Sequence, residues 1–271
     1  MAAVLCGGAS AWGECSRTIR VPVAPTGFNV LVQHDKVEGV YPELLRRLGS
    51  AQHCEFVFPI VPRARLAMMF FETQEADLFV PASRNAERDA KAEFVPMLKL
   101  TPALIMLGQR PDLVSDVPAL LAKKTWRGAM VRSYSWGDEY EALLRQLQSE
   151  KRVDFVSDLR TVGQMLRTGR VDFTILPPTL LYSALSLGAD GSLENGNSAP
   201  PWGFAREFQF MPLQGLPRSV VGAYLSRQTL SPADQQFLRE ALTRAAQDGS
   251  LLHNLQRYYP PEVLRQDVQI N

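Results

Sequence analysis

The sequence contains few of the side chains that most often carry metal or nucleophilic chemistry. Only 3 histidines and 3 cysteines occur among 271 residues. His34, His53 and His253 lie far apart, without the spacing of a metal site or a catalytic triad. Phosphate-loop, dinucleotide-binding, zinc-protease and serine-hydrolase motifs are also missing. The sequence therefore predicts no cofactor, no metal site and no catalytic residues.

An excess of charge of either sign is missing as well. The 29 Lys and Arg residues nearly balance 28 Asp and Glu residues, and no basic cluster occurs, which argues against a nucleic acid or an anionic membrane as partner. No apolar run reaches the length of about 18 residues that a membrane span needs. With 46% hydrophobic and 21% charged residues, the chain fits one large globular domain or two moderate ones. We expect a soluble monomer that binds a small molecule.

The first residues resemble the end of an export signal. Residues 1–11 are small and apolar and end in Ala-Ser-Ala, which fits a signal-peptidase site, although no basic segment precedes it. We interpret 1–11 as a signal-peptide remnant, with a short disordered tail as the alternative. Cys6 does not fit a lipid anchor, because Leu5 before it is too large for the usual small residue. An exported protein is predicted.

Two cysteines remain beyond this segment. Cys15 and Cys54 each precede a predicted strand, at 18–23 and 55–60. Adjacent parallel strands would bring these starts together, and an oxidising compartment would favour a disulfide. We predict a bridge between them, with two separate buried thiols as the alternative.

A buried strand that ends in polar residues is the main candidate for a binding site. The apolar run 78–80 stops at Pro81, and Ser83, Asn85 and Arg88 follow. A hydroxyl, an amide and a guanidinium at the end of one strand can converge on a carboxylate. The alternative is an ordinary strand-to-helix connection with a solvated arginine.

Strands and helices alternate along the first part of the chain. Residues 40–48 place apolar side chains on one helical face, and a second helix is predicted at 66–73. Ser231 before Pro232 has the pattern of a helix N-cap. Alternating strands and helices predict an α/β fold with parallel sheets.

One unit of this pattern occurs twice. Segments 73–81 and 168–177 both run from a helix end through an Asp and an apolar strand to a Pro. The repetition predicts two α/β lobes of similar design that present strand ends to a shared cleft. Two extended apolar runs, at 101–107 and 208–213, would connect the lobes.

These connections divide the chain discontinuously. We assign 12–105 together with 214–271 to lobe 1, and 106–213 to lobe 2. Two lobes with two crossings are typical of a hinged clamp.

The order of elements resembles the type II periplasmic solute-binding proteins, and within them the polar amino-acid-binding proteins of ABC transporters (extracellular solute-binding protein family 3). The residues that carry the resemblance are Ala76-Asp77 with its strand, Ser83 to Arg88, Phe94-Val-Pro96 and the helix before Asp248-Gly249. The resemblance implies a two-lobed fold in which each lobe has a mainly parallel sheet flanked by helices, joined by a two-strand hinge. It also implies periplasmic capture of an amino acid or related organic acid for an ABC-type permease.

The resemblance further implies which residues touch the ligand. In this family the arginine that matches Arg88 pairs with the ligand's α-carboxylate, and the serine that matches Ser83 bonds nearby. Asn85 stands where threonine is usual. Where members carry an acid for the ligand's ammonium group, this chain has Pro177-Pro178-Thr179, so whether the ligand has an amine stays open.

Further candidates come from loops and from the second lobe. The turn before a helix of that lobe offers donors to the same carboxylate. Phe28, at the tip of a turn, is a candidate cover for the ligand, with packing on the core as the alternative. Trp136 is another candidate, with core packing as its alternative. The additional binding residues predicted are Phe28, Ser133, Tyr134, Ser135, Trp136 and Thr179.

Two other functions remain compatible with this fold. A periplasmic enzyme, such as a dehydratase, and a sensory binding module can be built on the same two lobes. An enzyme would require a convergent acid and base. A sensor would require only that a partner recognise the ligand-bound form.

Overall fold

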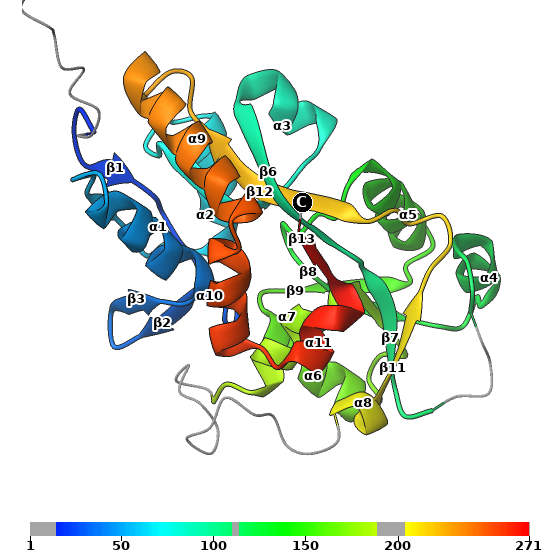
Figure 1. The fold of residues 1–271 in the computed structure, drawn as a ribbon. Coiled ribbons are helices and arrows are strands. Elements are labelled where there is room, and N and C mark those ends of the chain that lie inside the picture. The colour runs from blue at the N-terminus through cyan, green and yellow to red at the C-terminus, as the bar shows by residue number, and fades with distance from the viewer. Residues whose placement is uncertain (1–14, 110–113, 189–203, 271) are drawn as a thin grey trace, which may run out of the picture.

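The computed structural model describes residues 15–109, 114–188 and 204–270. Their helices and strands form two groups, with β6 and β12 running between them in Figure 1. We call the group that includes β1–β6 and β12 the first lobe, and the group that includes β7–β11 the second lobe. The predicted signal remnant at 1–11 lies outside the described residues.

The first lobe begins with two parallel strands, each followed by a helix. β1 (Ile19–Arg20) pairs with β4 (Phe56–Val57) in parallel. α1 (Val40–Ser50) and α2 (Arg63–Phe71) follow them. The buried residues of α1 include Val40, Leu44 and Leu45; these side chains lie on one face, as the spacing predicted. The strand–helix–strand–helix order was therefore readable from the sequence.

A short hairpin interrupts this order. β2 (Leu31–Gln33) and β3 (Lys36–Glu38) pair antiparallel between β1 and α1. Its turn, His34-Asp35, has positive φ angles of 46° and 64°. The sequence pattern did not predict this hairpin, because its strands are only 3 residues long.

The larger sheet of the first lobe is antiparallel. Its order is β13-β6-β12-β5, and every neighbouring pair is antiparallel. The strands are β5 (Leu78–Ser83), β6 (Glu93–Leu100), β12 (Ser219–Leu225) and β13 (Val268–Ile270). Parallel pairing is confined to smaller sheets, because β12 returns from the second lobe and inserts between β5 and β6.

Four more helices of the described residues belong to the same lobe as this sheet. α9 contacts β6 and β12, and Ser231 accepts a hydrogen bond from the Asp234 amide at 3.1 Å, which confirms the predicted N-cap. The helices are α3 (Ala86–Lys91), α9 (Pro232–Gln247), α10 (Ser250–Tyr258) and α11 (Pro261–Asp267).

The second lobe has a three-stranded antiparallel sheet. Its order is β10-β7-β11, formed by β10 (Thr174–Leu176), β7 (Ala103–Leu107) and β11 (Phe208–Pro212). The two runs predicted to connect the lobes thus pair with each other as β7 and β11.

A parallel pair and five helices surround this sheet in the described residues. β8 (Gly128–Val131) pairs in parallel with β9 (Val153–Val156). A bridge from Gly128 to Phe173 places β8 beside the start of β10. The helices are α4 (Val117–Ala122), α5 (Asp138–Ser149), α6 (Leu159–Arg167), α7 (Pro178–Leu185) and α8 (Phe204–Glu207).

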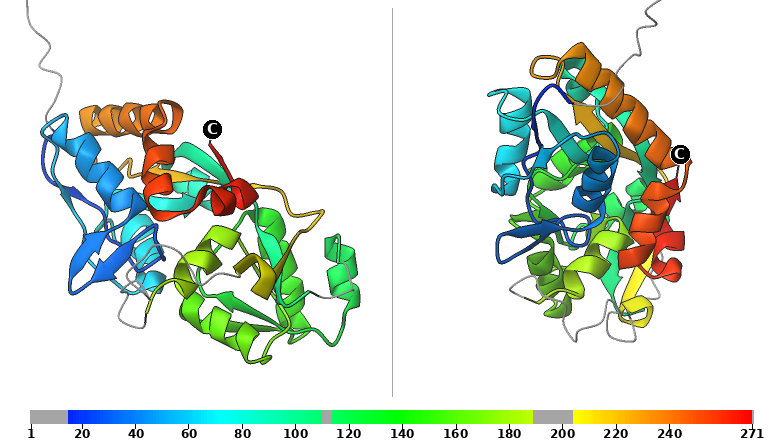
Figure 2. Two further views of the ribbon diagram at one scale, coloured as in Figure 1. Left: turned by 60° about the horizontal axis from the view of Figure 1, so that its bottom comes forward. Right: turned by 60° about the vertical axis from the view of Figure 1, so that its left-hand side comes forward.

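The chain passes between the lobes where β6 leads into β7 and where β11 leads to β12 (Figures 1 and 2). A third link comes from the C-terminal segment, because α11 contacts α7 while β13 pairs with β6. The C-terminal segment therefore touches both lobes beside the crossing strands.

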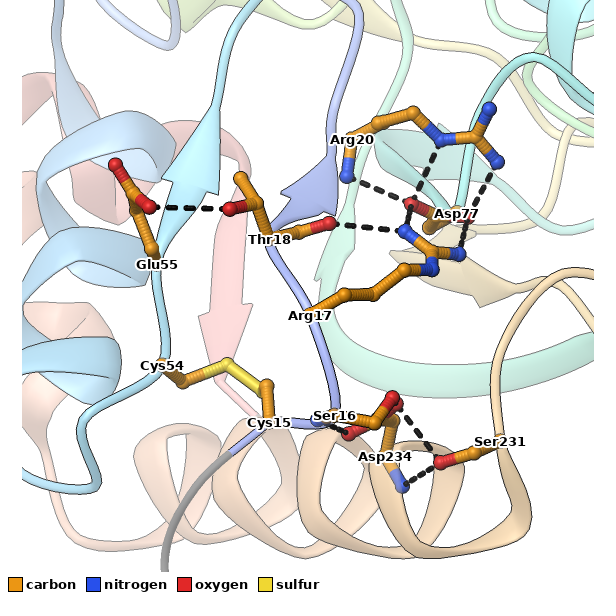
Figure 3. The surroundings of a disulfide bond; sticks show 10 residues. All are labelled: Cys15, Ser16, Arg17, Thr18, Arg20, Cys54, Glu55, Asp77, Ser231 and Asp234. Carbon is orange, nitrogen blue, oxygen red and sulfur yellow. Dashed lines mark hydrogen bonds and ion pairs between the residues drawn. A yellow bond between two sulfur atoms is a disulfide. The ribbon is translucent and has the colours of Figure 1, made fainter.

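The first described residues are held by a disulfide, which confirms the predicted pairing. Cys15 and Cys54 are joined, with Cα atoms 4.9 Å apart. Beside the bridge, Thr18 donates to Glu55 at 3.0 Å (Figure 3). The bridge thus fixes the two strand starts next to each other.

Asp77 ties β1 to the start of β5. Its carboxylate is fully buried and accepts hydrogen bonds from Arg17 at 2.7 Å and from Arg20 at 2.9 Å (Figure 3). Burial alone would raise the Asp77 pKa, but the hydrogen bonds from both arginines lower it well below its usual range. This ionised group positions the strand that ends at Ser83 and leads to Arg88.

Candidate functional site

A cavity lies between the lobes, at the end of β5. Its volume is about 50 Å³. Arg88 and Ser83 line it from the first lobe, and Ser133 and Thr179 line it from the second.

Most of the predicted binding residues line this cavity. All except Phe28 and Asn85 do so: Arg88, Ser83, Ser133, Tyr134, Ser135, Trp136 and Thr179. The two segments, 83–88 and 133–136, come from different lobes and approach each other only in the folded chain.

Arg88 is held in place by its own connection. Asn85 caps α3 by accepting a hydrogen bond from the Arg88 amide at 2.9 Å, and the Arg88 guanidinium donates to the Ser83 carbonyl at 2.9 Å. Its Cζ atom lies 5.4 Å from the centre of the Phe79 ring. Desolvation by burial lowers the Arg88 pKa. The guanidinium keeps further N–H groups that can donate to a ligand.

Asn85 does not line the cavity and instead caps the N-terminus of α3. Its side chain accepts the capping bond described above, and its own amide lies 3.2 Å from the Tyr224 hydroxyl. It lines two neighbouring, wider depressions of the surface. Its position supports Arg88 through the helix start.

Arg63 is a second cation in the wall, and the sequence pattern did not single it out. It begins α2 directly after Pro62 and donates to the Thr26 hydroxyl at 3.3 Å. Its Cζ atom lies 4.4 Å from the centre of the Tyr134 ring, a cation–π contact between the two lobes. Its place after a parallel strand was the available signal, because ligands bind at the carboxyl ends of such strands.

The second lobe contributes a strained turn. Ser133 has a φ angle of 65°, which is uncommon for a residue other than glycine. Tyr134 and Trp136 are buried, and their rings lie 5.7 Å apart in an edge-to-face arrangement. This backbone places Ser133 and Ser135 on the cavity wall together with the two aromatic rings.

Thr179 is hydrogen-bonded to Asp267, which lies near the C-terminal end of the chain. Its amide and hydroxyl both donate to Asp267 Oδ2, at 3.0 and 2.7 Å. Asp267 is 3% exposed, and burial raises its pKa to about 7. α7 has no side-chain cap of its own at Pro177, so Asp267 supplies one. A separation of 88 residues left no local signal for this contact.

Phe28 lies in the interior. It is fully buried and packs against the rings of Tyr182, Tyr258 and Tyr259, at centroid distances of 6.3, 5.9 and 5.3 Å. It is not among the residues that line the cavity. The structure thus places it in core packing, the alternative that the sequence left open.

The lobes touch each other around the cavity. Arg63 stacks on Tyr134, Phe28 packs on Tyr182, and a single buried apolar cluster continues from one lobe to the other. Gly27 lies so close to α7 that a Cβ atom there would be 1.9 Å from the Ser183 hydroxyl oxygen. The lobes are therefore in direct contact on several sides of the cavity.

No protein-family model matches the chain, and no curated protein sequence matches it. Solved structures do match over nearly the full length. A Listeria monocytogenes protein assigned as an L-cystine ABC transporter has a TM-score of 0.68 and 16% identity, covering 91% of this chain and 97% of its own. The ligand-binding core of GluR0 with L-glutamate has a TM-score of 0.66 and 16% identity, covering 90% and 98%.

A third similar structure belongs to a signalling protein. A histidine kinase sensor domain described as similar to periplasmic binding proteins has a TM-score of 0.64 and 13% identity, covering 90% of this chain and 96% of its own. At these identities the likeness establishes the fold. The chain has the two-lobed, type II periplasmic-binding-protein fold that the sequence predicted.

The described helices contain no candidate for a membrane span, since none combines the necessary length with the necessary apolar character. By name, the similar structures reported above are an ABC transporter protein, a ligand-binding core and a sensor domain.

Proposed function

We propose that this protein captures a small carboxylate-bearing solute between its two lobes. The observation that carries the proposal is Arg88, a desolvated guanidinium with free donors in a cavity between the lobes. A planar guanidinium binds a carboxylate through two parallel hydrogen bonds. Ser83 lines the same cavity from the first lobe, and Ser133 and Ser135 line it from the second. The ligand is an amino acid or a related organic acid.

The proposal includes delivery to an ABC-type permease. The protein is a periplasmic monomer that presents its closed, ligand-bound form to the membrane partner. The supporting observation is that a protein assigned as an L-cystine ABC transporter shares this fold over 97% of its length. The Cys15–Cys54 disulfide fits an oxidising compartment outside the cytoplasm.

A sensory role is the second candidate. It is favoured by the likeness to a histidine kinase sensor domain. Transport and sensing both require a ligand-induced closed state that a partner recognises, so they share the same site. An enzyme on this fold is the remaining alternative.

The experiment is a thermal-shift screen of the protein against amino acids and small organic acids. A carboxylate that binds only the native state raises the melting temperature. We expect a stabilised protein with at least one such ligand, loss of the shift in Arg88→Ala, and an unchanged shift in Arg84→Ala. Arg84 is the matched control because it is more exposed, binds Asp89 and does not line the cavity.

The same samples test turnover. Incubation with the identified ligand should return it unchanged, and formation of a product would favour the enzyme. A shift that persists in Arg88→Ala would contradict the proposed site.

A further inference from the structure

The charges that line the cavity are of one sign. Among its described lining residues, only Arg63 and Arg88 are charged. Both come from the first lobe, at the start of α2 and in the first turn of α3. No aspartate or glutamate of the described residues lines the same cavity.

Neither guanidinium is neutralised by a described carboxylate within ion-pair distance. Arg88 bonds to the Ser83 carbonyl, and Arg63 bonds to the Thr26 hydroxyl and stacks on Tyr134. Each guanidinium has five N–H donors, so most donors of both residues are left for a ligand. The two groups also influence each other, because Arg63 lowers the Arg88 pKa.

The acids that affect the Arg88 pKa do not line this cavity. Glu87 and Glu141 raise the Arg88 pKa, but both line the wider depression on the solvent side. There Glu87 binds Lys91 at 3.1 Å, and Arg145 lines the same wall. Arg63, Arg88 and residues 133–135 line the wider depression as well as the inner cavity, and Glu72 and Asp138 line the depression with them. The acids thus lie on the side of the wider depression, whereas the only charged residues in the described lining of the inner cavity are the two arginines.

The remainder of the cavity wall near the crossing strands is apolar. Leu98 and Leu100 come from β6, Val221 from β12, Val268 from β13 and Leu255 from α10. An ammonium group placed against these side chains would lose its hydration without gaining an acceptor.

Asp267, the buried acid that contacts the lining residue Thr179, does not itself reach the cavity. Its Oδ2 accepts two hydrogen bonds from Thr179, and its Oδ1 is buried without a hydrogen-bond partner among the described residues. Burial raises its pKa to about 7, so near neutral pH it is less fully ionised than an ordinary aspartate. Pro177 and Pro178, before Thr179, offer no side-chain acceptor.

We infer that the ligand is an organic acid without an ammonium group, whose anionic end is held jointly by Arg63 and Arg88 and whose hydrocarbon end faces Leu98, Leu100 and Val268. The inference rests on the proposed function and adds the class of solute. It makes Arg63 a specificity-determining residue.

The test compares matched pairs of ligands that differ only at one carbon. Binding of glutamate and of its α-keto acid, and of leucine and of its α-keto acid, is measured by titration calorimetry with the full chain. The keto acid of at least one pair should bind more than about tenfold tighter than the amino acid, because a buried unpaired polar group costs about 1–3 kcal/mol.

Variants separate the roles of the two arginines. Arg63→Ala should weaken binding of the keto acid by about tenfold or more. Arg65→Ala should leave it unchanged, since Arg65 lies two residues further along α2, is about half exposed and binds Glu75. Melting of each unliganded variant shows that it is folded, and the wild-type comparison of ligand pairs does not depend on any variant.

The outcomes distinguish this inference from the proposed function. If the amino acids bind as tightly as their keto acids, or if Arg63→Ala binds normally while Arg88→Ala does not, the inference is overturned and carboxylate capture stands. If no carboxylate of either series or of the wider screen binds, both fall.

Discussion

At the residue scale, two buried aspartates respond to pH in opposite directions. The Asp77 pKa is lowered by Arg17 and Arg20, whereas burial raises the Asp267 pKa to about 7. One carboxylate is therefore held ionised by two cations, while the other has only the neutral donors of Thr179. The difference in partners, at similar exposure, decides the sign of each effect.

Asp267 should make the protein less stable as pH rises from about 4 to about 7. Over that window the native state keeps a proton that the unfolded chain has released, so the free energy of unfolding falls with increasing pH. Asp267→Asn keeps an acceptor for Thr179 and removes this loss, so its advantage over the wild type should grow toward pH 7. Chemical denaturation across this pH range measures it, with the exposed Glu262→Gln as control; parallel pH profiles would contradict the prediction.

Asp77 should contribute stability that is lost in acid. Its folded pKa is lowered, so the contribution is complete above the unfolded value near 3.8 and declines as pH falls below it. At neutral pH, Asp77→Ala removes the acceptor shared by Arg17 and Arg20, which are 40% and 38% exposed, and should cost about 1.5–3 kcal/mol of unfolding free energy. Glu75→Ala, which removes the exposed pair with Arg65, should cost less than about 1 kcal/mol. If urea denaturation shows the same loss of unfolding free energy for both variants, Asp77 does not have the stabilising role proposed here.

Some site residues were predictable, and others were not, for physical reasons. Arg88 and Ser83 follow an apolar run and a proline, a local pattern that the sequence displays directly. Arg63 follows a strand in the same way, but its segment indicated only a helix start. Asp267 meets Thr179 through a contact that spans 88 residues, which no local pattern encodes.

At the element scale, the disulfide fixes the starts of β1 and β4. It closes a loop with a sequence separation of 39 residues, for which the chain-entropy model gives about 4 kcal/mol. Cys15→Ser with Cys54→Ser should lower the free energy of unfolding by roughly this amount. Guanidinium denaturation measures the loss. An unchanged double variant would show that the bridge does not stabilise the fold.

Helix and strand positions were predicted where periodicity or caps are strong. α1 and the N-cap at Ser231 agree with their patterns. The sequence did not reveal β13, a strand of 3 residues whose pairing with β6 depends on the assembled sheet. Predicted parallel pairing applies only to β1–β4 and β8–β9 among the named strands, because antiparallel return strands complete the other sheets.

At the scale of the whole molecule, the Gly27 backbone of the first lobe lies close to the Ser183 side chain of the second. Gly27 has a φ angle of 57°, and a Cβ atom there would collide with Ser183 on α7. Gly27→Ala should keep the lobes apart and weaken ligand binding by about tenfold or more. Small-angle scattering with the ligand identified in the screen should show a larger radius of gyration than for the wild type.

Gly169 offers a matched control for this variant. Its φ angle is 65°, and a Cβ atom placed there would have no neighbouring atom within 4 Å. Gly169→Ala thus carries the same backbone strain without the contact between lobes. If both variants close and bind alike, the lobe contact at Gly27 does not govern closure.

Whether a carboxylate binds Arg88 between the lobes can be seen in a crystal structure of the protein with the ligand from the screen. We expect a ligand carboxylate within about 3 Å of the Arg88 guanidinium nitrogens, with Ser83 and Ser133 beside it in the same cavity. A ligand bound elsewhere, or bound in this cavity with Arg88 unpaired, would contradict carboxylate capture by Arg88.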